Sequence, residues 1–235
     1  MPQRSTEAPP KSLHALEKLL AAYQFQSVLD VGCGPGRHWP FFREAGKEVT
    51  GIDIGRMADG VIVADYLQHE FDRQFDCLWL SHVLEHQLNV NLFLKKVFRD
   101  LKPGGILAMT VPPLKHNIVG GHVTLWNAGL LLYNLIMAGF DCSQARVKHY
   151  GYNISVLVPK VPAAVPYERL YFDRGDIELI SRFFPQHPQM KWEHSFRGDI
   201  AQLNWDANEL YFDEPRRRGI LKYLSRGYWR AKRAA

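Results

Sequence analysis

The stretch Val28-Leu-Asp-Val-Gly-Cys-Gly-Pro-Gly36 decides the fold. Its apolar start predicts a buried strand, and the pattern Gly32-x-Gly34-x-Gly36 predicts a tight turn into a helix. Glycines let the backbone bend sharply and approach a ligand closely because they carry no Cβ. A nicotinamide dinucleotide site would place a further glycine where Arg37 stands, which weakens that interpretation. Asp30, just before the turn, suits a ligand that presents a cation and hydroxyls rather than phosphates.

Short apolar runs alternate with helical stretches around this turn. Strands are expected over residues 27–31, 47–53, 61–64, 75–80 and 106–111, and helices over 12–25, 92–101 and 125–138, with a further helix that ends near residue 46. Ser12 is expected to cap the first helix. Two more runs, 145–149 and 154–158, meet across a short turn and predict a terminal hairpin. This alternation predicts a mostly parallel α/β sheet with helices on both faces and ligands at the carboxyl ends of the strands.

Acidic residues stand at the ends of the next two predicted strands. Asp53 ends the second strand, where a carboxylate can take both hydroxyls of a ribose in charge-assisted hydrogen bonds. Asp65 follows the third strand and can accept a hydrogen bond from an adenine amino group, with Tyr66 beside the ring. The three acids at three strand ends therefore predict a nucleoside-bearing ligand.

Five blocks in this order resemble the class I S-adenosylmethionine-dependent methyltransferases: residues 28–36, 49–53, 64–65, 75–86 and 101–107. The resemblance covers about residues 12–160. It implies a Rossmann-like seven-stranded sheet with a reversed last strand, and S-adenosylmethionine as the cofactor. Asp30 and the glycines would hold the methionine end of the cofactor, Asp53 the ribose and Asp65 the adenine. The full set of implied cofactor-binding residues is Asp30, Gly32, Cys33, Gly34, Gly36, Asp53, Ile54, Asp65, Tyr66, Ser81 and His82.

The segment His82-Val-Leu-Glu-His86 has the His-x-x-Glu-His order of a zinc-peptidase helix. Its position directly after a buried strand argues against a peptidase. The segment also resembles ubiquinone-biosynthesis O-methyltransferases, which use acidic and His residues here for a divalent ion. Glu85 and His86 match that pattern, but His82 stands where those enzymes have an acid, so no metal ligand is assigned. His86 is then a candidate catalytic base, or a residue that hydrogen-bonds the loop.

The segment after the fifth strand, residues 111–126, carries two further candidate bases, His116 and His122. Loop anchoring is the structural alternative for both. His122 followed by Ala138-Gly-Phe140 resembles methyltransferases from bacterial surface-polysaccharide gene clusters. The expected reaction is therefore O-methylation of a hydroxyl on a glycan or lipid-linked sugar. The alternative acceptor is a small metabolite such as a phenol, a quinone precursor or an amine.

The formal net charge of +5 is unevenly distributed. Residues 215–235 hold eight of the 29 basic residues and no acid, which leaves 21 basic against 24 acidic residues in 1–214. This amphipathic basic tail is expected either to contact an anionic membrane surface or to dock on its own domain. An RNA-binding protein or RNA methyltransferase that uses the tail is an alternative of another class, against which the mildly acidic body argues.

The composition sets the remaining expectations. Three Cys are too few for a disulfide scaffold, and no apolar run is long enough to span a membrane. The first residues lack the apolar core of a secretory signal, so a cytoplasmic enzyme, peripheral at the inner face of the membrane if the tail binds there, is expected. The predicted organisation is a flexible leader (1–11), a methyltransferase domain (12–160), an aromatic-rich extension packed on it (161–214) and the tail (215–235).

Overall fold

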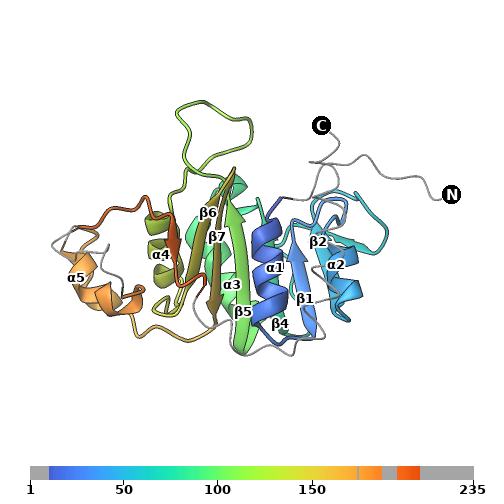
Figure 1. Ribbon diagram of the computed structural model, residues 1–235, viewed down its shortest axis with the longest axis horizontal. Helices are drawn as coiled ribbons and strands as arrows, with labels where there is room; N and C mark the ends of the chain where they lie inside the picture. Colours follow the sequence, from blue (N-terminus) through green and yellow to red (C-terminus); the bar gives the residue numbers. More distant parts are fainter. Residues whose placement is uncertain (1–10, 174, 187–194, 207–235) are drawn as a thin grey trace.

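The computed structural model describes residues 11–173, 175–186 and 195–206 (Figure 1). The strands are β1 Ser27–Val31, β2 Glu48–Asp53, β3 Val61–Val63, β4 Phe75–Ser81, β5 Leu101–Val111, β6 Arg146–Tyr150, β7 Asn153–Pro159 and β8 Gln202–Leu203. The α-helices are α1 Leu13–Ala22, α2 Trp39–Glu44, α3 Val90–Asp100, α4 Ala128–Met137 and α5 Asp176–Ile180, with 3₁₀ turns η1 Leu84–His86, η2 Tyr167–Arg169 and η3 Ser181–Phe183.

The strands form one sheet in the order β3-β2-β1-β4-β5-β7-β6-β8. Neighbouring strands from β3 to β5 are parallel, whereas β7 is antiparallel to both β5 and β6. The predicted fold and its reversed strand are thus confirmed. The short eighth strand was not predicted: Leu203, from beyond the sheet domain, pairs with Val147 on β6.

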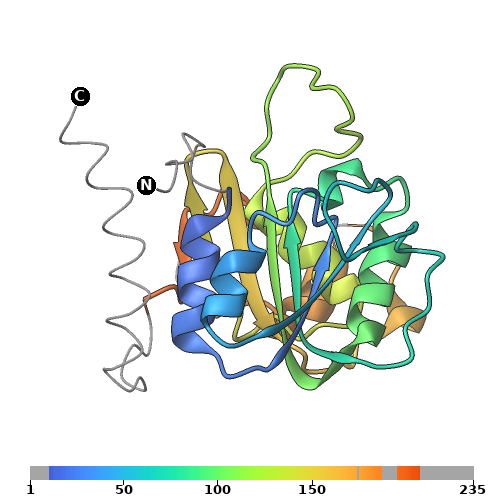
Figure 2. The same ribbon diagram turned by 90° about the vertical axis from the view of Figure 1, so that its right-hand side faces the viewer.

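Alternating residues on the strands build two cores, one on each face of the sheet. Val28, Trp79 and Ala108 pack in the core that includes α1, and Leu29, Leu78 and Leu107 pack in the core that includes α3 and α4. Figure 2 shows α1 and α2 on one side of the sheet and α3 on the other. Burial on both faces explains why the central strands read as continuous apolar runs.

The chain beyond β7 packs against the sheet domain where it is described. Ile180 and Phe184 belong to the core that includes α4, and Trp205 belongs to the core that includes α1. The leader up to residue 10 and the basic tail 215–235 lie outside the described residues. Within the described ranges, no helix is long and apolar enough to cross a bilayer.

Two local predictions were wrong. Ser12 does not cap α1: its φ is 65°, its side chain makes no cap hydrogen bond, and its Oγ lies 2.7 Å from Ser81 Oγ. The Ser12 hydroxyl is therefore bonded to Ser81, which is distant in sequence, and not to the backbone of its own helix. Strand β5 begins at Leu101, five residues before the predicted start, because Leu101 already pairs with Phe75 on β4.

The segment between β5 and α4 rises above the carboxyl edge of the sheet (Figures 1 and 2). It holds residues 112–127 and is called the acceptor loop below. At its root the two arms of the loop are joined to each other, because the N–H of Leu114 donates to the carbonyl of Trp126 at 2.8 Å.

Candidate active site

The glycine turn after β1 is closely packed on one side and open at its middle. Gly32, Gly34 and Gly36 all have positive φ, at 66°, 51° and 69°. A Cβ on residue 32 would lie 2.4 Å from Val83 Cγ2, so only glycine fits there. A Cβ on residue 34 would meet no heavy atom within 4 Å. The backbone at Gly34 is therefore the part of the turn that a ligand can approach.

Asp30 is a buried carboxyl group directly before this turn. Its side chain is 1% exposed, and its Oδ2 accepts a hydrogen bond from Trp39 Nε1 at 2.9 Å. Burial raises the pKa of Asp30 to about 8, with the hydrogen bond from Trp39 opposing the rise and the nearby Asp53 carboxylate adding to it. A ligand cation beside Asp30 would favour its ionised form. Trp39 was not among the predicted site residues, and the sequence carries no signal for its bond to Asp30.

Asp53 joins the glycine turn to the end of β2. Its Oδ2 accepts from the backbone N–H of Gly34 at 2.8 Å, and its Oδ1 accepts from that of Gly55 at 3.0 Å. Ile54, next to it, is exposed. Asp65 is also exposed, and its Oδ1 accepts from the N–H of Leu67 at 2.9 Å. Carboxylates thus stand at the carboxyl edge where the cofactor-binding acids were predicted.

Three of the other predicted cofactor-binding side chains are engaged inside the protein. Tyr66 is 5% exposed and its hydroxyl donates to Asp100 Oδ2 at 2.9 Å, so its ring packs in the core instead of lying open to an adenine. Cys33 is buried, and burial raises the pKa of its thiol to about 12, which keeps it protonated. Ser81 shares its hydrogen bond with Ser12.

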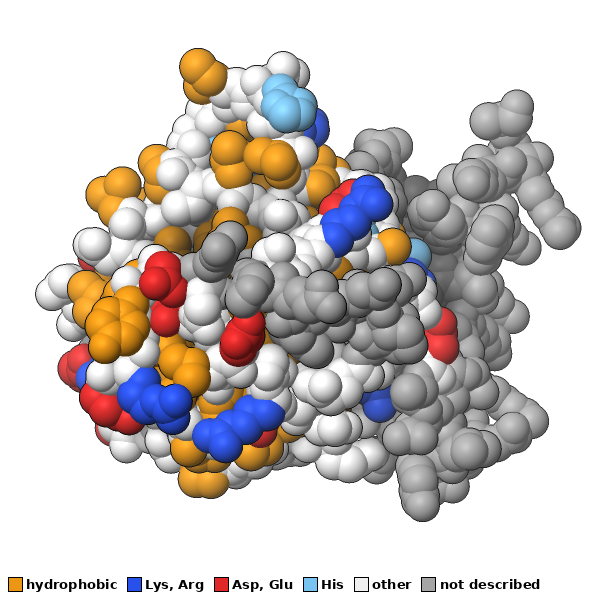
Figure 3. Space-filling model, turned by 90° about the vertical axis from the view of Figure 1, so that its left-hand side faces the viewer, with side chains coloured by type: hydrophobic (Ala, Val, Ile, Leu, Met, Phe, Trp, Pro, Cys, Tyr) orange, Lys and Arg blue, Asp and Glu red, His pale blue; other side chains and the backbone are white. Residues whose placement is uncertain are grey.

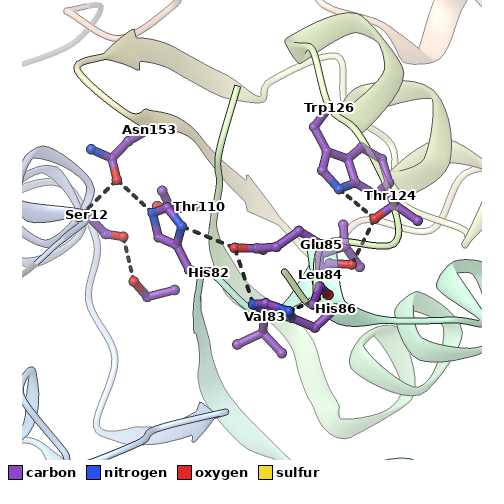
Figure 4. A network of polar contacts seen from close by, with 12 residues as sticks. Ser12, His82, Val83, Leu84, Glu85, His86, Thr110, Thr124, Trp126 and Asn153 are labelled. Atoms are coloured by element: carbon purple, nitrogen blue, oxygen red, sulfur yellow. Dashed lines mark hydrogen bonds and ion pairs between the residues drawn. The ribbon is translucent and has the colours of Figure 1, made fainter. Parts of the chain in front are cut away.

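His82 lies in a polar network between the hairpin and η1 (Figure 4). Its φ is 59°, and its Nε2 and Nδ1 lie 3.0 Å from Asn153 Oδ1 and 3.1 Å from Glu85 Oε1. Asn153 Nδ2 donates to the Tyr150 carbonyl and its Oδ1 accepts from the Ser12 N–H, which orients the amide. His82 Nε2 therefore donates to Asn153.

Glu85, His86 and His122 come together next to this network. Glu85 is fully buried, and its Oε2 has no hydrogen-bond partner in the part of the chain that the structure describes. His86 Nδ1 lies 2.7 Å from the Gly121 carbonyl oxygen, so Nδ1 carries a proton and Nε2 keeps its lone pair when the ring is neutral. The rings of His86 and His122 lie 5.1 Å apart at 86°.

The acceptor loop encloses a cavity of about 450 Å³. His116 and His122 both line it, with Lys115, whose Nζ lies 4.0 Å from the ring centre of Tyr152. Most of the other lining residues are apolar: Pro112, Pro113, Leu114, Ile118, Val119, Val123, Leu125 and Trp126. Figure 3 shows apolar side chains on the part of the molecule that projects at the top of the view. Of the three predicted bases, the structure thus brings His86 and His122 together, while His116 belongs to the cavity alone.

The strand order with its reversed β7, and the acids at the ends of β1 and β2, define a class I S-adenosylmethionine-dependent methyltransferase. The chain belongs to a methyltransferase-domain family: the model of this family matches residues 5–170. S-adenosylmethionine is its cofactor. The open backbone at Gly34 and the acids beside it fit such a ligand.

Two groups of curated relatives match part of this chain. A malonyl-[acyl-carrier protein] O-methyltransferase of Salmonella typhimurium is 34% identical over 110 residues, which cover 42% of this chain and 44% of the relative. A ubiquinone biosynthesis O-methyltransferase of Pseudomonas fluorescens is 34% identical over 96 residues, 34% of this chain and 41% of the relative. The chain thus matches less than half the length of these relatives.

Among solved structures, the 1,6-didemethyltoxoflavin-N1-methyltransferase of Burkholderia thailandensis shares the fold. Its structure holds 1,6-didemethyltoxoflavin and S-adenosylhomocysteine. The TM-score is 0.55 at 17% sequence identity, with 64% of this chain and 80% of that chain covered.

Proposed function

We propose that the protein transfers the methyl group of S-adenosylmethionine to an oxygen atom of an acceptor bound under the acceptor loop. The observation that carries this proposal is the loop cavity, which is lined by His122 beside His86 at the carboxyl edge that also carries the glycine turn. Both curated relatives described above are named O-methyltransferases, which supports oxygen as the accepting atom.

The chemistry asks little of the protein beyond alignment and proton removal. The sulfonium of the cofactor already activates the methyl group, so the acceptor oxygen attacks the methyl carbon as the carbon–sulfur bond breaks. Reacting atoms need to approach to about 3–3.5 Å. Asp30, Gly34, Asp53 and Asp65 would hold the cofactor, and the cavity would hold the acceptor.

A hydroxyl acceptor also has to lose its proton to a base. His86 is suited to this role because its hydrogen bond to Gly121 leaves Nε2 with a lone pair. His122 lines the cavity and contacts His86, so it is the second candidate. His116 is the third, because it lines the same cavity.

The lining of the cavity favours an acceptor with an apolar body. Leu114, Ile118, Val123 and Leu125 are exposed on the loop, and a small metabolite with an apolar part would bury them. The glycan or lipid-linked sugar predicted from the sequence is the second candidate acceptor, for which the polar lining residues Lys115, Asn117 and Thr124 offer hydrogen-bonding groups. Membrane contact through residues 215–235 and RNA methylation stay predictions, since both depend on the tail.

The acceptor class is tested by methyl transfer from labelled S-adenosylmethionine to two panels. One panel holds phenols, carboxylic acids and amines, and the other holds sugar nucleotides and lipid-linked glycans. Product with the apolar phenols or acids supports the proposal, and product with sugars alone identifies the glycan acceptor instead. Methylation only of amines would contradict oxygen as the accepting atom. Cofactor binding without product in either panel would contradict both acceptor classes.

A further inference from the structure

The cluster of Glu85, His86 and His122 has the composition and spacing of a metal site. Each residue offers one ligand atom, and these three atoms all lie within 4.8 Å of one another. Glu85 and His86 belong to η1, whereas His122 comes from the acceptor loop, 36 residues further along the chain. The sequence pattern pointed only to the segment 82–86, so the loop ligand is a property that the fold of this chain adds.

Glu85 and His86 each turn one possible ligand atom toward the other, since Glu85 Oε1 lies 3.9 Å from His86 Nε2. The Gly121 carbonyl accepts from His86 Nδ1 at 2.7 Å, which leaves Nε2 free to coordinate. Metal-bound His residues are oriented by hydrogen bonds of this kind. His82 binds Glu85 Oε1, and the fully buried Oε2 has no hydrogen-bond partner among the described residues. A buried carboxylate oxygen without a partner is unfavourable, and a cation that bound the Glu85 carboxylate through both oxygens would remove that cost.

The position of His122 follows from backbone contacts between the acceptor loop and η1. The N–H of Val123 donates to the Glu85 carbonyl at 2.9 Å, which holds the neighbouring His122 beside η1. The ring nitrogens of His122 make no hydrogen bond to any residue in the described ranges, and its ring meets that of His86 edge to face. If this part of the loop served only as an anchor, the backbone hydrogen bond of Val123 would be sufficient. That role does not explain why two imidazoles lie beside a buried carboxylate.

We propose that Glu85, His86 and His122 bind one divalent first-row transition ion, and that His122 makes the acceptor loop part of the metal site. Two imidazoles and one carboxylate suit Zn²⁺, Co²⁺ or Fe²⁺ better than Mg²⁺, which prefers oxygen ligands. Three protein ligands leave coordination positions open, as in catalytic sites. Because His122 also lines the cavity, ion binding links the loop to η1 at the place where the acceptor enters. When bound, the ion would occupy the lone pairs that make His86 and His122 candidate bases, and it would instead supply Lewis acidity that lowers the pKa of an acceptor hydroxyl.

The test uses the full chain without an affinity tag, stripped of metals with a chelator. Calorimetry with Zn²⁺ is expected to give one ion per chain. His122→Asn should weaken binding at least about tenfold, as should Glu85→Gln, because each removes a ligand. His149→Asn is the matched control: His149 is exposed on β6, remote in sequence from the cluster, and its loss should leave Zn²⁺ affinity unchanged. Co²⁺ should give visible absorption bands in wild type that His122→Asn alters.

Three results would overturn the proposal. They are no Zn²⁺ or Co²⁺ binding by folded wild type, equal affinity in wild type and His122→Asn, or equal weakening by His149→Asn. Circular dichroism establishes that each variant is folded, and His122 lies in a loop, so its substitution tests the site even if Glu85→Gln does not fold. S-adenosylmethionine binding is measured on the same samples. Cofactor binding without metal binding would overturn only the metal site. Metal binding without cofactor binding would overturn only the proposed methyl transfer.

Discussion

Gly121 lies directly against His86. Its carbonyl oxygen is 2.7 Å from His86 Nδ1, and a Cβ on residue 121 would come within 3.2 Å of the same nitrogen. The φ of Gly121 is 76°, a conformation that favours glycine. The acceptor loop therefore approaches His86 through the one residue type that allows both the close contact and the backbone conformation.

Replacing Gly121 by alanine should separate the loop from His86. The added methyl group would strain the backbone and push the imidazole away, so methyl transfer should fall about 10- to 100-fold, as for other displacements of reacting groups. The matched control is Gly120→Ala, because a Cβ there would meet no atom within 4 Å. The kcat/KM values of both variants check this, and equal values for the two would contradict the role of the contact.

The buried Asp30 should make stability depend on pH. Its folded pKa of about 8 lies above the ordinary value of 3.8, so between these values the folded state holds a proton that the unfolded state loses. The free energy of unfolding should therefore fall as the pH rises from about 4 to about 8, by at most about 1.4 kcal/mol per pH unit from this group. Below about pH 4, the contribution of Asp30 to the free energy of unfolding is fully present. Urea unfolding of wild type and Asp30→Asn at several pH values measures the difference, and a difference independent of pH would contradict the assignment.

Cofactor binding should release a proton from the same carboxyl group. The cationic cofactor would favour the ionised form of Asp30, which burial keeps protonated near pH 7 in the free protein. Up to one proton should be released per cofactor bound. Calorimetry at pH 7 in two buffers of different ionisation enthalpy measures this, with Asp30→Asn as the variant expected to release none. Equal proton release in wild type and variant would show that another group is responsible.

Asn153 should stabilise the arrangement around His82. Its Oδ1 accepts from His82 Nε2 and from the Ser12 N–H, and His82 has a backbone φ of 59° that is unusual outside glycine. Asn153→Ala should lower the free energy of unfolding by about 1–3 kcal/mol because it removes the acceptor for both donors. Asn153→Asp keeps acceptor oxygens and should lose less. Chemical unfolding checks both variants, and an Asp variant less stable than the Ala variant would contradict this account.

Local sequence patterns were sufficient for seven strands of the sheet and for its acidic edge. Asp30 and Asp53 lie at the ends of adjacent parallel strands, β1 and β2, so apolar runs of the right spacing place both at one edge. The same patterns could not predict Tyr66. Its hydroxyl bonds to Asp100 on α3, and this tertiary contact turns the ring into the core.

The cluster of Glu85, His86 and His122 depends on contacts between distant segments. It forms because Val123 donates to the Glu85 carbonyl and Gly121 accepts from His86, and neither bond has a signal in the spacing of residues. Strand β8 also depends on a contact between distant segments, because Leu203 pairs with Val147 on β6 and no residue spacing predicts that pairing. The sequence could therefore list the histidines but could not select His86 and His122 as the pair that meets.

The most direct test of the central claim is the affinity for S-adenosylmethionine, measured by calorimetry on the full chain. Wild type should bind one cofactor, and Asp53→Ala should bind at least about tenfold more weakly, since charge-assisted hydrogen bonds contribute about 1.5–3 kcal/mol. Asp72→Ala, at an exposed position before β4, should bind like wild type. No binding by folded wild type, or equal affinity in wild type and Asp53→Ala, would contradict the assigned cofactor site.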